Sequence, residues 1–425
     1  MASTEKIRIA IIGGGLAGAT LINALLKLPH LQVNIFESAP EFSERGAAVG
    51  LSINAQTALA EIGGDIVGAP DKAGAVQMLS SRLLVACGPD AGEVIFDLGA
   101  EKQGKQVHRA ALLAEILKPV PKEQAHTSKK LLNIEEGAGG SLTLHFKDGT
   151  TFQTDAVIGA DGIHGYVRSY VLGADHPALK PTFAGFWDCG SVVSVEKART
   201  ALGERWLRDG EERQYGWLGD GGFFMYGMLD GGKNVQCVAS ALTDEEWSED
   251  EWKRGIGREK LEEIFGGWTN APIKEGIIDI LVSNPDLRAF SQWHFSKDAP
   301  TFSKDRVCMM GDAAHALTPW QGAGAGQAIE DAMVLQTVLG KIKTSSELEA
   351  AFRAFDEVRR PRAQRIRASS REAGITMCGR GENGMNVEKV REELKSKWDF
   401  IFDQDQKEQN DNAVKALLNS LGKDS

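Results

Sequence analysis

The pattern of apolar and polar residues changes character along this 425-residue chain. Near the start, apolar runs at residues 7–12 and 33–37 flank a mostly apolar helical stretch that ends near Pro29. Short apolar runs predict buried strands, and the longer stretch between them predicts a helix that lies on a sheet. The order strand, helix, strand therefore predicts a parallel α/β unit of the Rossmann type.

Between about residues 179 and 290, short strand-like runs replace this rhythm. Runs at 223–229 and 235–241 flank the turn-prone sequence Asp-Gly-Gly-Lys-Asn, which predicts an antiparallel hairpin. Many aromatic residues also lie in this segment. A sheet that carries many rings suits an aromatic ligand, although each single ring can equally belong to the core.

After about residue 291 the α/β pattern returns, and residues 346–425 are helix-prone. We therefore predict an α/β fold in which residues 1–178 and 291–345 form a Rossmann-like, three-layer domain with a parallel sheet. Residues 179–290 are predicted to form an inserted domain with a mixed or antiparallel sheet, and residues 346–425 a helical region. The arginine-rich stretch at 359–367 is typical of a solvated helix face, with an anion site as the alternative.

The first predicted turn has the composition of a dinucleotide site. Gly13 allows a tight turn from strand to helix, Gly15 leaves room for phosphates, and Gly18 lets the helix pack on the strand. The helix start also offers backbone N–H groups to an anion. Glu37 ends the next predicted strand, where a carboxylate can bind ribose hydroxyls and repel a 2′-phosphate.

A second stretch, some three hundred residues later, indicates a flavin. The apolar run at 307–310, which follows Arg306, leads into Gly311 and Asp312, and a glycine-rich helix start follows at 322–326. The acid can bind sugar-like hydroxyls at the end of its strand. The exposed N–H groups of the helix start can stabilise negative charge on a reduced isoalloxazine ring. The two stretches together predict FAD as the cofactor.

Composition and charge narrow the class of protein. A net charge of -11 argues against a nucleic-acid partner, and no apolar run is long enough for a membrane span. The five cysteines are scattered and no signal peptide is evident, which predicts reduced thiols and a cytoplasmic location. The eight histidines do not cluster at ligand spacing, so we expect no metal site. A monomer and a homodimer both fit the sequence.

These motifs resemble those of the single-component, FAD-dependent aromatic hydroxylases, and within them the salicylate hydroxylase-like group. The resemblance covers nearly the whole chain. It rests on GGGLAG at 13–18 with Glu37, on His108 and Arg109 before a predicted helix, on residues 155–168 around Asp161, on GDAAH at 311–315, and on QGAGAGQAIED at 321–331.

The resemblance implies a set of contacts to FAD, from the pyrophosphate and ribose to the edge of the flavin ring. The residues that it implies bind FAD are Gly13, Gly15, Gly18, Glu37, Arg45, Gly50, Arg109, Asp161, Asp312, Gly324 and Ala325.

The resemblance also implies the reaction. NADH or NADPH, bound transiently, would reduce FAD, and a flavin C4a-hydroperoxide formed with O2 would transfer one oxygen atom to an electron-rich aromatic ring. The implied substrate is a small phenol, a salicylate-like acid or a heteroaromatic ring such as indole. The alternative is a flavin-dependent oxidase or dehydrogenase on the same fold, which would not hydroxylate the ring.

Three residues are candidates for the chemistry itself. Tyr226 matches the tyrosine of related hydroxylases and could handle a phenol proton, and His315 is a further candidate; a structural role is the alternative for each. Trp320 follows the loop proline, where salicylate hydroxylases usually have histidine, and Cys189 stands where related enzymes often have arginine. Both changes remove partners for a carboxylate or phenolate, which favours a larger, more neutral ring over salicylate.

Overall fold

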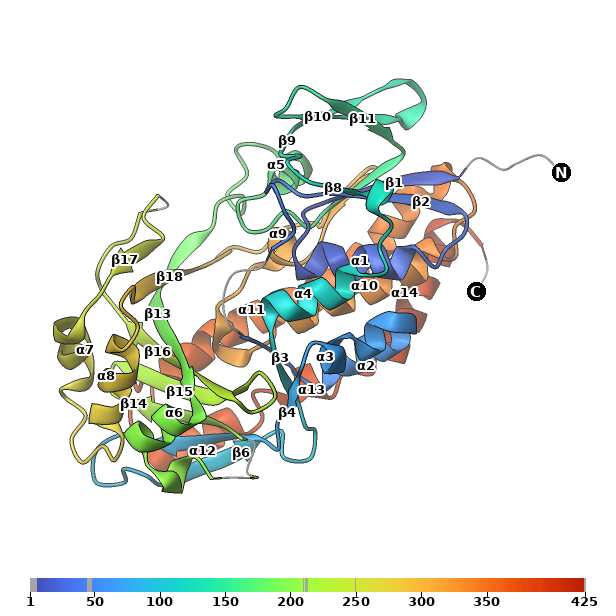
Figure 1. Ribbon diagram of the computed structural model, residues 1–425. Coiled ribbons are helices and arrows are strands. Elements are labelled where there is room, and N and C mark those ends of the chain that lie inside the picture. The colour runs from blue at the N-terminus through green and yellow to red at the C-terminus, as the bar shows by residue number, and fades with distance from the viewer. Residues whose placement is uncertain (1–5, 44–47, 209, 211–212, 249, 424–425) are drawn as a thin grey trace.

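The computed structural model of the protein contains two large sheets, one toward each end of the molecule (Figure 1). The structure describes residues 6–43, 48–208, 210, 213–248 and 250–423. In that part of the chain, no helix is long and apolar enough to cross a membrane. The five cysteines are all free thiols.

The first sheet has the strand order β19-β20-β12-β1-β2-β8, and every pair is parallel except β19 with β20. Its strands are β1 (Ile7–Ile12), β2 (Leu31–Phe36), β8 (Ala125–His126), β12 (Ala156–Gly159), β19 (Ser303–Lys304) and β20 (Val307–Met309). Strands β12 and β20 are buried along their whole length. Continuous apolar runs of this kind are expected where a parallel sheet is covered on both faces.

Helices cover one face of this sheet, and a small antiparallel sheet lies over the other (Figure 1). The helices are α1 (Leu16–Leu25), α4 (Arg109–Leu117) and α10 (Gly324–Leu339), and the small sheet consists of β9 (Leu131–Glu136), β10 (Leu142–Phe146) and β11 (Thr151–Thr154). This arrangement confirms the predicted Rossmann-like, three-layer fold.

The second sheet has eight strands in the order β17-β18-β13-β16-β15-β14-β5-β6. The strands are β5 (Ser81–Val85), β6 (Val94–Leu98), β13 (Thr182–Ser194), β14 (Gln214–Gly219), β15 (Gly222–Leu229), β16 (Asn234–Leu242), β17 (Lys253–Gly255) and β18 (Arg288–His294). All pairs are antiparallel except β5 with β14. The predicted hairpin is confirmed as β15 and β16.

Strands β5 and β6 lie inside the segment 1–178 that the sequence assigns to the Rossmann-like domain. The structure instead places them in the second sheet, because Ser81 to Val85 pair in parallel with Gln214 to Leu218. The domain boundaries predicted at residues 178, 290 and 345 therefore divide the chain into segments, but these segments do not coincide with the two sheets.

The second sheet is covered on both faces. Trp217 and Tyr226 lie on one face, in a core that includes residues of α6 (Val195–Leu202), α7 (Arg258–Phe265) and α8 (Lys274–Val282). Phe186 and Phe223 lie on the other face, where they contact Trp320 and where C-terminal helices pack. Side chains alternate between the faces of a strand, so the sequence position alone decides which core each residue joins.

The remaining elements join the two sheets. A small sheet of order β3-β7-β4 lies between them, and α11 runs from the first sheet toward the second (Figure 1). These elements are β3 (Ala48–Leu51), β4 (Val76–Gln77), β7 (Lys105–His108), α2 (Ile53–Ile62), α3 (Ala69–Lys72), α5 (Tyr166–Leu172), α9 (Asp312–His315), α11 (Leu348–Met377), α12 (Val387–Lys395), α13 (Asp399–Phe402) and α14 (Gln406–Ser420). The last four confirm the predicted helical C-terminal region.

A buried ionic cluster joins α10 to α11. Glu330 and Asp331 of α10 and Arg359 of α11 are all fully buried. The guanidinium of Arg359 donates to Asp331 Oδ1 (2.7 Å) and to Glu330 Oε2 (2.6 Å). Arg362 donates to both oxygens of Glu330 at 2.8 and 2.9 Å. Asp331 Oδ2 also accepts the backbone N–H of Gly311 (2.9 Å), so the cluster reaches the loop after β20.

The cations of this cluster keep its carboxylates ionised. Burial alone would raise the pKa of Glu330, but Arg359 and Arg362 lower it to about 2. Burial likewise opposes the ionisation of Asp331, and His315 and Arg359 nevertheless shift its pKa below the ordinary value. Complete pairing of this kind is what allows charges to be buried without a large loss of stability.

The predicted solvated face at residues 359–367 is wrong for three of its arginines, because Arg362 is also largely buried and paired with Glu330. Arg359 is fully buried in the ionic cluster, and Arg367 is 8% exposed and donates to Asp298 (2.7 Å) and to the carbonyl of Phe295. The helix passes between the two sheets, so one side of it faces protein rather than solvent. The charges on that side are paired within the chain.

We expect Arg359→Ala to lower the free energy of unfolding by about 3–5 kcal/mol, because it removes the one guanidinium that bonds to both buried carboxylates and leaves Asp331 Oδ1 without its donor. Arg353→Ala on the same helix is the matched control, since Arg353 forms an exposed pair with Glu349 (3.2 Å). That variant should cost less than about 1 kcal/mol. Urea unfolding of both variants measures the difference, and equal costs would show that the buried cluster adds nothing to stability.

Candidate active site

The glycine turn between β1 and α1 is tightly enclosed by backbone. Gly13 has φ 107°, and a Cβ there would lie 2.2 Å from the carbonyl oxygen of Ala160. A Cβ on Gly18 would lie 2.0 Å from the carbonyl oxygen of Gly13. Both positions therefore require glycine, as predicted. Gly15 is the N-terminal cap of α1, so the first backbone N–H groups of that helix lie beside it.

Glu37 reaches back to this turn from the end of β2. Its Oε2 accepts the backbone N–H of Gly14 (2.7 Å), and its Oε1 accepts the backbone N–H of Ala39 (2.7 Å). The carboxylate is therefore oriented at the mouth of the turn, where an acid can meet ribose hydroxyls.

Asp161 lies beside the same turn, at the end of β12. A Cβ on Gly13 would come within 2.9 Å of its Cα. Its Oδ2 accepts the backbone N–H of Val167 (3.0 Å), whereas its Oδ1 is buried and has no hydrogen-bond partner among the described residues. Burial raises the pKa of Asp161 to about 6, although the N–H of Val167 opposes the shift. An unpaired buried oxygen of this kind suits a ligand hydroxyl.

The second predicted motif lies next to the first in space. A Cβ on Gly311 would lie 3.0 Å from the Cβ of Ala17 in α1. Arg168, at the far end of the Asp161 segment, donates to the carbonyls of Ala313 (3.0 Å) and Ala314 (2.8 Å). Three segments that are distant in the sequence thus converge on one place, as a single dinucleotide would require.

The other predicted cofactor residues surround this place. Asp312 begins α9 and is exposed, and Gly324 and Ala325 begin α10. Arg109 begins α4, directly after β7, and Gly50 lies on β3, which pairs with β7. A Cβ on Gly50 or Gly324 would meet nothing within 4 Å, so space for a flat ring is open there. Arg45 lies outside the described residues.

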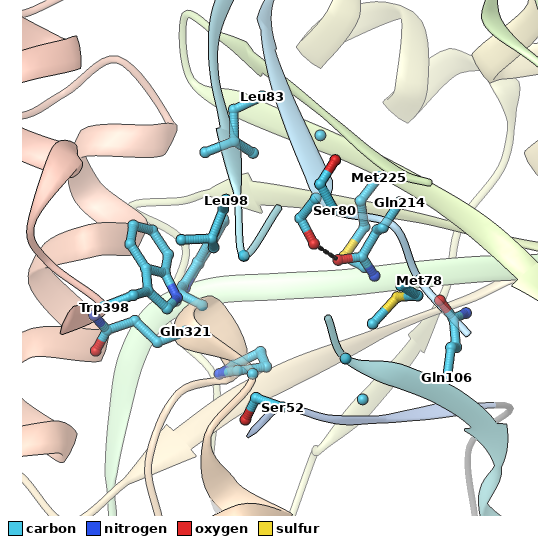
Figure 2. Close-up of a pocket in the computed structure, with 18 of the residues that line it drawn as sticks. Ser52, Met78, Ser80, Leu83, Leu98, Gln106, Gln214, Met225, Gln321 and Trp398 are labelled. Atoms are coloured by element: carbon cyan, nitrogen blue, oxygen red, sulfur yellow. Dashed lines mark hydrogen bonds between the residues drawn. The ribbon is translucent and has the colours of Figure 1, made fainter. Parts of the chain in front are cut away.

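A cavity of about 350 Å³ opens where these loops meet the second sheet. Gly50, Ser52 and the loop from Pro319 to Gly322 line its cofactor side. Figure 2 shows Leu98 and Trp398 on one side of this space and Gln214, Met225 and Met78 on the other. A concave site with mostly apolar walls and a few polar groups is typical of small-molecule binding.

Trp320 forms part of the cavity wall. It is 8% exposed, and its ring centroid lies 5.0 Å from that of Phe186 and 5.6 Å from that of Phe223. Its indole also packs on Gly374 of α11, where a Cβ would lie 2.4 Å from Nε1. Trp320 is therefore held between the sheet and α11, and it can contact a ring bound in the cavity.

The structure does not bring Tyr226 to the cavity. Phe223 and Met225 line the cavity from β15, so strand alternation turns Tyr226 to the opposite face. There its hydroxyl donates to the carbonyl of Trp206 (2.7 Å), and its ring stacks on Tyr215 at 5.2 Å. This geometry favours the structural alternative for Tyr226.

His315 also lies away from the cavity lining. It is 1% exposed, and its Nε2 lies 2.7 Å from Asp331 Oδ2 in the ionic cluster. The ring therefore braces the loop between β20 and α10. This position supports the bracing role that the sequence offered as the alternative to catalysis.

Comparisons with known proteins agree with this geometry. A family model described as an FAD binding domain matches residues 269–370. The 6-methylsalicylate 1-monooxygenase of Aspergillus terreus is 36% identical over 443 residues, which cover 100% of this chain and 95% of that enzyme. The chain belongs to the salicylate hydroxylase-like FAD-dependent monooxygenases. It is thus an FAD-dependent enzyme, as its sequence motifs predict.

Other members of the family give the same result. A salicylate hydroxylase of Pseudomonas putida is 32% identical, with 95% of this chain and 93% of that protein covered. The solved structure of a salicylate hydroxylase substrate complex superimposes with a TM-score of 0.85 at 27% identity, and covers 97% of this chain and 99% of the other. The likeness includes the second sheet and the C-terminal helices as well as the FAD-binding part.

The protein's own residues fit FAD. The enclosed glycine turn, the unpaired oxygen of Asp161 and the open space at Gly50 and Gly324 suit the pyrophosphate, a hydroxyl and the flavin ring respectively. No group of three His, Cys, Asp or Glu side chains in the described part of the chain is placed to hold a metal ion.

Sequence reasoning missed one cavity residue, Asp188. The sequence drew attention to its neighbour Cys189, but Cys189 is buried in the core on the other face of the sheet. Asp188 points into the cavity from β13. A single acid inside an otherwise largely apolar strand was the available signal.

The raised pKa of Asp161 predicts a pH-dependent stability of the FAD-free protein. Its pKa is about 6 in the fold and 3.8 ordinarily, so its stabilising contribution is complete below about pH 4 and lost as the pH rises through 6. We expect Asp161→Asn to remove this loss, a change on the order of 2 kcal/mol. Urea unfolding at a series of pH values measures it. The exposed Asp175→Asn is the control and should leave the pH profile unchanged.

Proposed function

We propose that this monooxygenase couples the oxidation of NADH or NADPH to the insertion of one oxygen atom of O2 into a small, electron-rich aromatic ring. The observation that carries the proposal is the cavity, which is shared by the FAD-binding loops and the aromatic face of the second sheet. A ring bound there would lie next to the open space at Gly50, where the flavin ring fits.

FAD, when bound, supplies the activated oxygen, and the protein supplies binding and orientation. Gly13, Gly15 and the start of α1 would hold the pyrophosphate, with Glu37 at the ribose. Asp312 and the start of α10 would hold the ribityl chain and the edge of the flavin. The resemblance implies these roles, and the positions of the residues around the convergent turn support them.

The cavity wall would keep water from the reacting atoms. Trp320 and Phe223 close one side of the cavity with aromatic surface, and Phe186 packs on Trp320 behind it. Exclusion of water favours oxygen transfer to the ring over loss of the oxygen as peroxide. Trp320 would also position the substrate ring by edge or face contact.

Neutral groups provide most of the polarity of the cavity. Gln214 and Gln236 line it, together with Ser81, whose hydroxyl donates to Gln214 Oε1 (2.9 Å). Such groups can orient hydroxyl, carboxyl or ring N–H substituents. The names of the relatives point to salicylates, and the cavity also suits a phenol or an indole-like ring.

Turnover with isotopically labelled O2 tests the proposal. Purified enzyme with FAD is mixed with NADH or NADPH and with each member of a panel of phenols, salicylates and indoles. We expect one panel class to accelerate the oxidation of the reduced nucleotide and to yield a product with one labelled oxygen atom. Carbon dioxide release would distinguish decarboxylating hydroxylation from simple hydroxylation.

The same experiment can contradict the proposal. Label that enters the product from water would exclude oxygen transfer from O2. Stoichiometric peroxide with an unchanged ring, in the presence of every panel member, would instead indicate a flavin-dependent oxidase.

A further inference from the structure

A carboxylate lies on the sheet side of the cavity. Asp188 of β13 is the one acid among the described residues that line this space. Its Oδ1 accepts hydrogen bonds from Ser240 Oγ of β16 and from Gln292 Nε2 of β18 (2.7 Å). Both donors bond to Oδ1, and no described residue donates a hydrogen bond to Oδ2. The side chain is thus held by the sheet and has one oxygen available to a ligand.

No free cation balances Asp188 in the described lining of the cavity. Lys102 is the single basic side chain there, and it forms an ion pair with Asp403. Both members of that pair are more than 40% exposed, so they belong to the mouth of the cavity rather than to its interior. A carboxylate on a bound ring would consequently meet Asp188 without a compensating charge.

The surroundings of Asp188 set its charge near neutral pH. Burial raises its pKa to about 6, and the hydrogen bonds from Ser240 and Gln292 oppose this shift. Cys378, at the end of α11, is a further titratable neighbour; burial, and to a smaller extent Asp188, raise the pKa of its thiol. At pH 7 and above, Asp188 is therefore mainly ionised and can accept a proton.

We propose that Asp188 accepts a hydrogen bond from an O–H or N–H group of a neutral aromatic substrate, that it also takes the proton where this group is a phenolic O–H, and that it selects against ring carboxylates. This inference rests on the proposed function, because it takes the ring in the cavity to be the ring that is hydroxylated. A charge-assisted hydrogen bond attracts a neutral donor, whereas a buried second anion is repelled and desolvated.

The proton transfer balances as follows for a phenol. The substrate O–H bond breaks and an O–H bond forms on Asp188, so the negative charge moves from the carboxylate to the phenol oxygen. The electron pair on that oxygen raises the electron density of the ring, which then attacks the oxygen atom made available by O2 and the reduced cofactor. The ring carbon loses its own proton as aromaticity returns, and Asp188 releases its proton to solvent or product.

A matched set of ligands tests this selection. The compounds 3-methylphenol and 6-methylsalicylate differ by one carboxylate, and 3-methylanisole lacks the O–H donor. Indole and indole-2-carboxylate form a second pair with an N–H donor. Affinity for the holoenzyme is measured by calorimetry, and kcat/KM by substrate-stimulated NADH or NADPH oxidation with product analysis. We expect the neutral donor of a pair to bind more tightly than its carboxylate and than the anisole.

Two variants of Asp188 distinguish the effect of its negative charge from the effect of its side-chain shape. Asp188→Asn should lower kcat/KM for the neutral donor by about ten- to a hundredfold and should tighten binding of the matching carboxylate. It should also remove the rise of activity with pH through about 6. Asp188→Glu keeps the charge and should retain the preference for neutral rings. The exposed Asp279→Asn is the control and should change neither ligand order nor pH profile.

Each outcome decides the inference. The inference would be overturned if the unaltered enzyme bound and hydroxylated each carboxylate better than the matching neutral ring, and if Asp188→Asn left this order unchanged. That result would leave the proposed function intact. Failure of every panel ring to be hydroxylated would overturn the proposed function instead. If Asp188→Asn does not retain FAD, Ser240→Ala replaces it. That variant loosens the carboxylate and should lower kcat/KM for the neutral donor by about three- to tenfold.

Discussion

The pairing of Glu330 and Asp331 with Arg359 is the interaction on which the arrangement of the site depends. It fixes the start of α10, which borders the FAD space, against α11, which supports Trp320 through Gly374. Asp331 alone also bonds to Gly311 and His315 in the loop after β20. Because a buried carboxylate that loses its cation is very costly, these elements can move only together. The cofactor side and the substrate side of the cavity are thereby kept in one geometry.

The alternation of side chains along each strand then decides which of them line the cavity. Along β15, Met225 reaches the substrate space, whereas Tyr226 joins the core under α6 to α8. Along β13, Asp188 reaches it and Cys189 does not. Two residues that are adjacent in a strand therefore lie on opposite faces, so that one can act on a substrate while the other belongs to the core. The chemistry offered to a substrate depends on this alternation more than on the overall number of polar or aromatic residues in the sheet.

The local features could be predicted from the sequence because their signals are local. Gly13 with Glu37, the hairpin of β15 and β16, and the helical C-terminal region each follow from residues close together in the chain. The faces of the second sheet could not be predicted, since both are covered and both are rich in apolar and aromatic side chains, so the pattern does not identify the cavity side for Tyr226 or Asp188. The pairing of β5 with β14 and the burial of Arg359 depend on contacts between distant segments, which leave no local signal.

Family membership and substrate choice depend on different parts of this structure. The groups that we propose hold FAD are mainly backbone, glycines and helix starts, which tolerate sequence change; the fold itself is preserved at a TM-score of 0.85 with 27% identity. On our proposal, the substrate is selected by a few side chains on one face of one sheet. Neither Asp188 nor Trp320 belongs to the ionic cluster or to the glycine turn, so a change at either residue would alter the cavity and leave those two features in place. Likeness to salicylate hydroxylases therefore indicates the cofactor and the reaction class, whereas the ring that is admitted would, on our proposal, depend on the charge inside the cavity.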